Sequence, residues 1–314
     1  MPTDPAEAAI PSPAPARHPW RGYAYIASAT LCWGVAATVG KAVFNGELFA
    51  GHSQISPLVL TQTRTTFSVL VLGLYLLVRF GRSFLRISRH DLILCVLAGT
   101  LGVAGSNFFY YLAIQKATVA IAITLQYTAP VWVLLYMVLR GREPALWSRF
   151  GSVLLALLGI TLTIGLFQSG LKFNVAGAGA ALMASFSFAF YNILAPSLVS
   201  RNHQLKVMLY AVLGAAILWA VINPPWHLLA QEYNARQWGF LFAFACLSLL
   251  LPYSLYFNGL RYLDATRAVI ASCLEPVFAV LFAAAFVGEA VRGLQMLGIS
   301  AVLAATVMAQ LGHK

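Results

Sequence analysis

The chain has 314 residues, of which 60% are hydrophobic and 9% are charged, and its formal net charge is +11. One soluble core cannot cover so much apolar surface, so the composition excludes an ordinary soluble domain and predicts an integral membrane protein surrounded by a lipid bilayer. The positive charge does not indicate a nucleic-acid partner, because the basic residues fall between apolar runs instead of gathering in one region.

The N-terminal segment 1–19, MPTDPAEAAIPSPAPARHP, is rich in Pro and Ala. It lacks the apolar stretch that a cleavable secretory signal needs. We expect a disordered cytoplasmic tail.

Apolar runs of the length that crosses a bilayer, about 20 residues, follow one another along the rest of the chain. They predict an all-α membrane fold with ten transmembrane helices. The runs are 23–44, 58–78, 92–114, 117–139, 150–167, 176–196, 207–222, 238–260, 268–287 and 294–311.

The basic residues between these runs predict the orientation, because cytoplasmic connections carry an excess of Lys and Arg. With the N-terminus inside, two of the 20 basic residues lie within spans, at Lys41 and Arg64. Only four lie in outer connections, and these are Lys116, Lys172, Arg236 and Arg292. The remaining fourteen are cytoplasmic, so we expect a multi-pass inner-membrane protein with both termini in the cytoplasm.

An internal repeat appears when the chain is shifted against itself by 146 positions, the distance from Pro130 to Pro276. The shift also pairs Tyr110 with Tyr256, Ala122 with Ala268, Leu135 with Leu281 and Glu143 with Glu289. Segments 20–167 and 168–314 would then be repeats of five helices each. Because five is odd, the second repeat enters the membrane from the opposite side, and inverted repeats of this kind carry a substrate site near the midplane at their interface.

These features resemble the drug/metabolite transporter superfamily, specifically its EamA type. The resemblance rests on ten spans in two halves, Trp33-Gly34 in span one, Arg64 within TRTTF, a mid-helix proline in span four, and LEPVFAVLFAAAFVGE in span nine. It implies a secondary transporter that works by alternating access, commonly an exporter of amino acids or related metabolites. The halves differ in two respects: Ala129 stands where the second half has Glu275, and the first half reads Gly141-Arg142-Glu143 where the second has Gly288-Glu289 directly.

Glu275 and Pro276 interrupt an apolar run, and Pro130 does so in the first half. A buried charge is costly in a membrane and normally faces a cavity with a partner. Each proline leaves the carbonyl four residues earlier without its N–H, which kinks the helix. We expect Glu275 to bind a substrate amine, a proton, or each in turn, and the two kinks at Pro130 and Pro276 to hinge the gates. The alternative is that the acid accepts structural hydrogen bonds and the prolines only shape packing.

Arg64 and Lys41 are the two basic residues within spans. A cation that lines a cavity can hold a substrate carboxylate, and arginine does so with two parallel bonds. The alternatives are a structural ion pair or headgroup contact for Arg64 and a snorkelling side chain for Lys41.

Uncharged polar residues recur within the spans, and buried amides and phenols need hydrogen-bond partners that one wet cavity would supply. Hydrogen bonds between helices are the alternative explanation for each of them. The candidates are Asn107, Tyr111, Gln126, Tyr127, Tyr191, Asn192, Tyr253 and Tyr256. Trp33 is a candidate for stacking on a substrate or for ordinary packing.

The motifs of membrane enzymes and ATP-driven pumps do not occur: the sequence has no HExxH, no G-x-S-x-G and no Walker lysine loop. We therefore predict no catalytic residue, no metal and no cofactor, and a small-molecule substrate moved by a gradient or by exchange. A flippase of lipid-linked substrates is the nearest alternative within transport. A membrane enzyme acting on lipid-linked groups is the alternative from another class.

Overall fold

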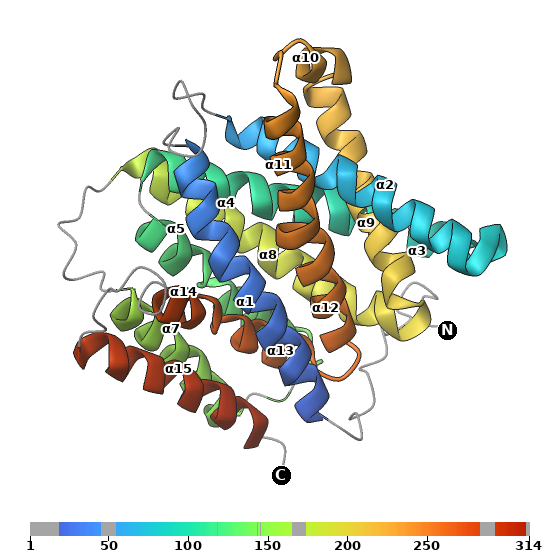
Figure 1. Cartoon of the computed structure of the whole chain (residues 1–314). Helices are drawn as coiled ribbons and strands as arrows, with labels where there is room; N and C mark the ends of the chain where they lie inside the picture. The colour runs from blue at the N-terminus through green and yellow to red at the C-terminus, as the bar shows by residue number, and fades with distance from the viewer. Residues whose placement is uncertain are drawn as a thin grey trace, which may run out of the picture.

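The computed structural model describes residues 19–44, 55–117, 119–142, 144, 146–164, 174–282 and 293–311. Within these ranges the regular secondary structure is helical, as the sequence predicts (Figure 1). The predicted tail lies outside the described residues except for Pro19, where the first helix begins.

The helices follow the predicted runs closely. The first half contains α1 (Pro19–Phe44), α2 (Pro57–Phe84), α3 (Arg89–Leu97), the π-helix η1 (Ala98–Ala104), α4 (Gly105–Lys116), α5 (Val119–Gln126), α6 (Ala129–Leu139) and α7 (Trp147–Thr163). The second half contains α8 (Val175–Arg201), α9 (Gln204–Ile222), α10 (Pro225–Leu229), α11 (Ala235–Ala245), the π-helix η2 (Cys246–Leu250), α12 (Leu251–Gly259), α13 (Ala265–Ser272), α14 (Glu275–Phe282) and α15 (Gly293–Leu311).

Eight helical segments among the described residues are long and apolar enough to cross a membrane. Two further apolar helices, Trp147–Thr163 and Gly293–Ala309, are shorter. The chain is therefore an all-helical, multi-pass membrane protein, and a count of ten crossings stays a prediction.

Polar residues at the helix starts explain where many of the helices begin. Ser56 accepts the N–H of Val59 and is followed by Pro57 at the first helical position of α2. Asp264 accepts the N–H of Arg267 at the start of α13. These side chains satisfy N–H groups that have no partner within the helix.

The helix boundaries of the two halves recur at the predicted offset of 146 residues. The matching starts are Arg89 and Ala235, Gly105 and Leu251, and Ala129 and Glu275, and the matching ends are Ala104 and Leu250, and Gln126 and Ser272. The offset therefore relates backbone features as well as residue types, including both π-helices and both interruptions. The inverted orientation of the halves stays a prediction.

Two predicted features differ in position from the structure. The interruptions near Pro130 and Pro276 fall at residues 127–128 and 273–274, before each proline, and not at the proline itself. The sixth run was predicted to end at 196, but α8 continues through Pro196 to Arg201. A proline removes only its own N–H, so a well-packed helix can continue past it.

Small residues allow the helices around the site to approach closely. A Cβ atom at Gly34 of α1 would lie 3.1 Å from the carbonyl oxygen of Glu275 and 3.2 Å from the nitrogen of Ala279. Glycine at this position therefore lets α1 pack against the backbone of α14, as small residues commonly do at helix contacts in membranes.

Candidate functional site

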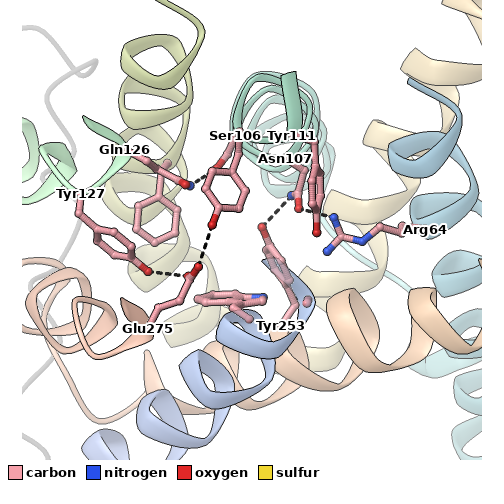
Figure 2. Close-up of a pocket in the computed structure, with 12 residues that line it drawn as sticks. Arg64, Ser106, Asn107, Tyr111, Gln126, Tyr127, Tyr253 and Glu275 are labelled. Atoms are coloured by element: carbon pink, nitrogen blue, oxygen red, sulfur yellow. Dashed lines mark hydrogen bonds between the residues drawn. The ribbon is translucent and has the colours of Figure 1, made fainter. Parts of the chain in front are cut away.

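A pocket lies between helices of both halves, and Figure 2 shows its polar walls. The empty space between its walls, which includes space open to the surroundings, is about 410 Å³. Its lining residues are Trp33, Ala36, Arg64, Ser106, Asn107, Tyr110, Tyr111, Gln126, Tyr127, Phe188, Tyr253 and Glu275.

Glu275 forms the acidic end of the pocket. It is the first residue of α14, directly after the interruption, where the helix dipole favours a negative charge. Its side chain is buried, with 5% of the residue exposed. Tyr110 donates a hydrogen bond to Oε1 at 3.1 Å, and Tyr127 donates one to Oε2 at 2.7 Å. Both tyrosines come from the first half, so the acid of one half is held by hydroxyls of the other.

Arg64 forms the basic end and is 1% exposed. Nη1 donates to Oδ1 of Asn107 at 3.0 Å, and Nη2 donates to the carbonyl oxygen of Ser248 at 2.7 Å. The rings of Tyr111 and Phe244 lie 5.0 and 5.4 Å from the guanidinium carbon. No ion pair of Arg64 occurs among the described residues, and its Nε has no hydrogen-bond partner there.

The carbonyl of Ser248 is available to Arg64 because of a local backbone feature. Ser248 lies in η2, and the residue four positions later is Pro252, which has no N–H to donate. π-helices occur frequently at functional sites because they disturb the regular backbone hydrogen bonds. The carbonyl oxygen of Ser248 is therefore an uncharged acceptor for the buried guanidinium of Arg64.

Asn107 and Tyr253 connect the two halves in the middle of the pocket. Nδ2 of Asn107 donates to the hydroxyl of Tyr253 at 2.9 Å and to the carbonyl of Val103 at 2.7 Å. Positions 107 and 253 are separated by 146 residues, the offset of the repeat. Since this contact joins the two halves of the chain, the pocket lies between them.

Ser106 and Gln126 line the pocket beside the tyrosines that hold Glu275. Nε2 of Gln126 donates to Oγ of Ser106 at 3.3 Å. Ser106 precedes Tyr110 by one helical turn, and Gln126 directly precedes Tyr127. Figure 2 shows this pair on the Glu275 side, away from Arg64.

Aromatic rings form the remaining wall. The ring of Trp33 lies 5.3 Å from that of Tyr253 and 6.4 Å from that of Phe188, both edge to face. Behind this layer, Tyr256 donates to Oδ1 of Asn192 at 2.6 Å, and its ring packs 5.9 Å from that of Tyr191.

The structure brings most of the predicted site residues together. The eight that line the pocket are Trp33, Arg64, Asn107, Tyr111, Gln126, Tyr127, Tyr253 and Glu275. Tyr191, Asn192 and Tyr256 do not line it but form the packed layer behind the aromatic wall. Lys41 belongs to α1, but its side chain lies outside the described residues.

Sequence reasoning did not identify Ala36, Ser106, Tyr110 and Phe188 as site residues. Tyr110 carried one usable signal, because the repeat pairs it with Tyr256. Pro252 carried a signal for the contact of Arg64 with Ser248, since a proline within a span leaves the carbonyl four residues earlier without its usual N–H partner.

A multi-pass helical bundle with a polar, charged pocket buried between two related halves is the architecture of a membrane transporter. The sequence matches the EamA-like transporter family over residues 20–165 and again over residues 175–310. The chain belongs to this family, and the family places it among transporters and not among enzymes.

Similar proteins agree with this assignment. The threonine/homoserine exporter RhtA of Salmonella typhimurium is 30% identical over 244 residues, which cover 76% of this chain and 78% of that protein. The uncharacterized inner membrane transporter YicL of the same species is 22% identical, covering 94% and 96% of the two chains. One crystal structure has a TM-score of 0.71 at 20% identity and covers 92% of this chain and 96% of that chain, which shows a shared fold.

Proposed function

We propose that the protein exports α-amino acids by alternating access, with the substrate held in the pocket between Arg64 and Glu275. The single observation that carries this proposal is that a buried arginine and a buried acid line one pocket without pairing with each other. Burying two opposite charges apart is costly, and a ligand that carries both complementary charges would offset that cost.

The remaining hydrogen-bonding capacity of both groups supports a zwitterionic ligand. Each carboxylate oxygen of Glu275 accepts one tyrosine hydroxyl and retains a further lone pair for an ammonium. Arg64 retains its Nε–H and one N–H on each Nη for a carboxylate, since Nη1 and Nη2 each make one hydrogen bond to a protein oxygen. The amine of an amino acid would therefore lie at Glu275 and its carboxylate at Arg64.

The names of the relatives support this substrate class and the outward direction. RhtA of Salmonella typhimurium and RhtA of Escherichia coli K12, which is 29% identical, are both threonine/homoserine exporters. Each covers 76% of this chain.

We assign proton coupling to Glu275, whose carboxylate would bind a proton and a substrate amine in turn. Within the described ranges, the partners of the Glu275 carboxylate are neutral hydroxyls, and an acid held in this way can exchange one positive partner for another. The interruptions before Pro130 and Pro276 would serve as the hinges, because each leaves a weakened point in a helix beside the pocket.

The same proposal places the protein in the cytoplasmic membrane with both termini inside. The excess of basic residues in the predicted inner connections supports this orientation. Figure 1 shows the start of α1 and the end of α15 toward the same side of the bundle.

The experiment is counterflow of labelled amino acids into proteoliposomes that contain the purified protein, with and without an imposed pH gradient. We expect uptake of at least one α-amino acid that depends on the gradient and is lost in Glu275→Gln. The matched control is Ser152→Ala, whose hydroxyl bonds the carbonyl of Ser148 in its own helix. Absence of transport for every amino acid would contradict the proposal and favour a lipid-like substrate.

A further inference from the structure

Ser106 and Gln126 form a polar pair in the pocket with hydrogen-bonding groups left over. Ser106 is 3% exposed and accepts from Gln126 at 3.3 Å, longer than the usual 2.9–3.0 Å of an N–H···O bond. No acceptor for the Ser106 hydroxyl hydrogen is found among the described residues. In contrast, Ser152 and Ser254 each return their hydroxyl to the carbonyl four residues earlier.

The amide of Gln126 is similarly incomplete. One N–H reaches Ser106, and the amide oxygen has no partner in the described part of the chain. The assignment of oxygen and nitrogen in an amide can be exchanged. In either orientation, one group of the amide remains unmatched and borders the pocket.

We propose that Ser106 and Gln126 form a hydroxyl subsite, which selects amino acids with a short hydroxylated side chain over isosteres that lack the hydroxyl. The inference rests on the proposed function. A hydroxyl both donates and accepts, so it can accept from the Ser106 O–H and donate to the Gln126 amide oxygen at the same time. An aliphatic side chain of the same shape would leave both groups unpaired, which sites of this type reject.

The position of the pair agrees with this role. Tyr110, one turn after Ser106, and Tyr127, next to Gln126, both donate to Glu275. A substrate whose amine lies at Glu275 therefore places the substituent on its α-carbon near the subsite. The second half has no such pair, since the positions equivalent to Ser106 and Gln126 are Pro252 and Ser272. The hydroxyl of Ser272 bonds the carbonyl of Ala268.

The test uses two pairs of isosteres, threonine with valine and homoserine with norvaline, as competitors of counterflow in proteoliposomes. Each pair exchanges a hydroxyl for a methyl group. We expect the wild type to prefer the hydroxylated member roughly tenfold, the effect of one to two hydrogen bonds. Ser106→Ala and Gln126→Met should bring the ratio toward one by weakening the hydroxylated member, with the aliphatic member unchanged or improved.

Ser152→Ala is the matched control, because it removes a buried serine hydroxyl that does not line the pocket, and it should keep the wild-type ratio. If Ser106→Ala does not fold, the wild-type ratio and Gln126→Met still decide the question. Transport of both members at equal affinity by the wild type would overturn the subsite, as would a preference that survives both substitutions. Failure to transport any of these four amino acids while another α-amino acid is transported would overturn the subsite alone. Failure to transport every α-amino acid would overturn the proposed function, and the subsite with it.

Discussion

The two interrupted helices have the same backbone plan and different chemistry. In the first half, α5 ends at Gln126 and α6 begins at Ala129, and in the second half α13 ends at Ser272 and α14 begins at Glu275. The acid stands only in the second half, whereas the tyrosines that hold it belong to the first. The two halves thus share a backbone plan at these helices, but unequal residues at equivalent positions give them different parts of the pocket: the second half supplies the acid and the first half supplies the hydroxyls that hold it.

The largest expected effect follows from removing or relocating the acid. Glu275→Gln keeps the shape of the side chain but loses the charge, so substrate affinity should fall on the order of 100-fold, as for a buried charge partner. Response to an imposed pH gradient should disappear at the same time. The measurement is counterflow in proteoliposomes with pH varied on one side.

A relocated acid sharpens the same comparison. The double variant Glu275→Ala with Ala129→Glu moves the carboxyl to the equivalent position of the first half. It should not restore transport, because the residues equivalent to Tyr110 and Tyr127 are Tyr256 and Cys273, and Tyr256 already bonds Asn192. Full transport by the relocated acid would mean that the tyrosine partners are irrelevant.

The basic end should be the next most sensitive. Arg64→Lys keeps the charge but cannot reach Asn107, Ser248 and a ligand together, because a single ammonium replaces the planar guanidinium. We expect affinity to fall about tenfold, equivalent to losing ~1.4 kcal/mol. Wild-type affinity in Arg64→Lys would show that a point charge at this place is sufficient.

A smaller effect is expected from the hydroxyls that hold Glu275. Tyr127→Phe removes the 2.7 Å hydrogen bond without changing the ring. Loss of such a bond costs about 1 kcal/mol, or roughly fivefold in affinity. Tyr110→Phe, which removes the longer 3.1 Å bond, should have a smaller effect. Equal or reversed effects in competition assays would contradict the role assigned to Tyr127.

The smallest effect on transport is expected from the helix contact behind the acid. Gly34→Ala places a Cβ atom 3.1 Å from the carbonyl oxygen of Glu275, so α1 and α14 must separate slightly. Overpacking of this kind costs roughly 1–3 kcal/mol of stability. A thermal unfolding assay in detergent should therefore show a lowered midpoint. An unchanged midpoint would mean that the two helices separate without cost.

Much of this architecture was readable from the sequence, for identifiable reasons. Isolated charges such as Glu275 and Arg64 stand out in apolar runs because a membrane makes them costly. The 146-residue offset was visible in residue types, and it reappears in the helix boundaries. By contrast, Ser106 and Phe188 could not be assigned, since a serine or a phenylalanine within a span can belong to a helix contact as well as to a pocket wall. Their roles depend on helix rotation, which packing determines.

Backbone irregularities were only partly predictable. Pro130 and Pro276 indicated interruptions, yet the interruptions fall before the prolines, and Pro196 leaves α8 continuous. The outcome at each proline depends on which neighbours satisfy the freed carbonyl. At Pro252, that neighbour is Arg64, which bonds the carbonyl of Ser248 across a sequence separation of 184 residues.

The most direct test of the account is a cycle of ligands and variants for whichever amino acid is transported. The α-methyl ester of that amino acid lacks the negative charge, and its N-acetyl derivative lacks the positive charge, so each probes one end of the pocket. Competition constants would be measured for the wild type, Arg64→Ala and Glu275→Gln. We expect the ester to bind the wild type more weakly than the parent amino acid does, but to bind Arg64→Ala as well as the parent does. Likewise, the N-acetyl derivative should bind the wild type more weakly than the parent, but bind Glu275→Gln as well as the parent. Independent losses, with each derivative weakened equally in every variant, would contradict the assignment of the two charges.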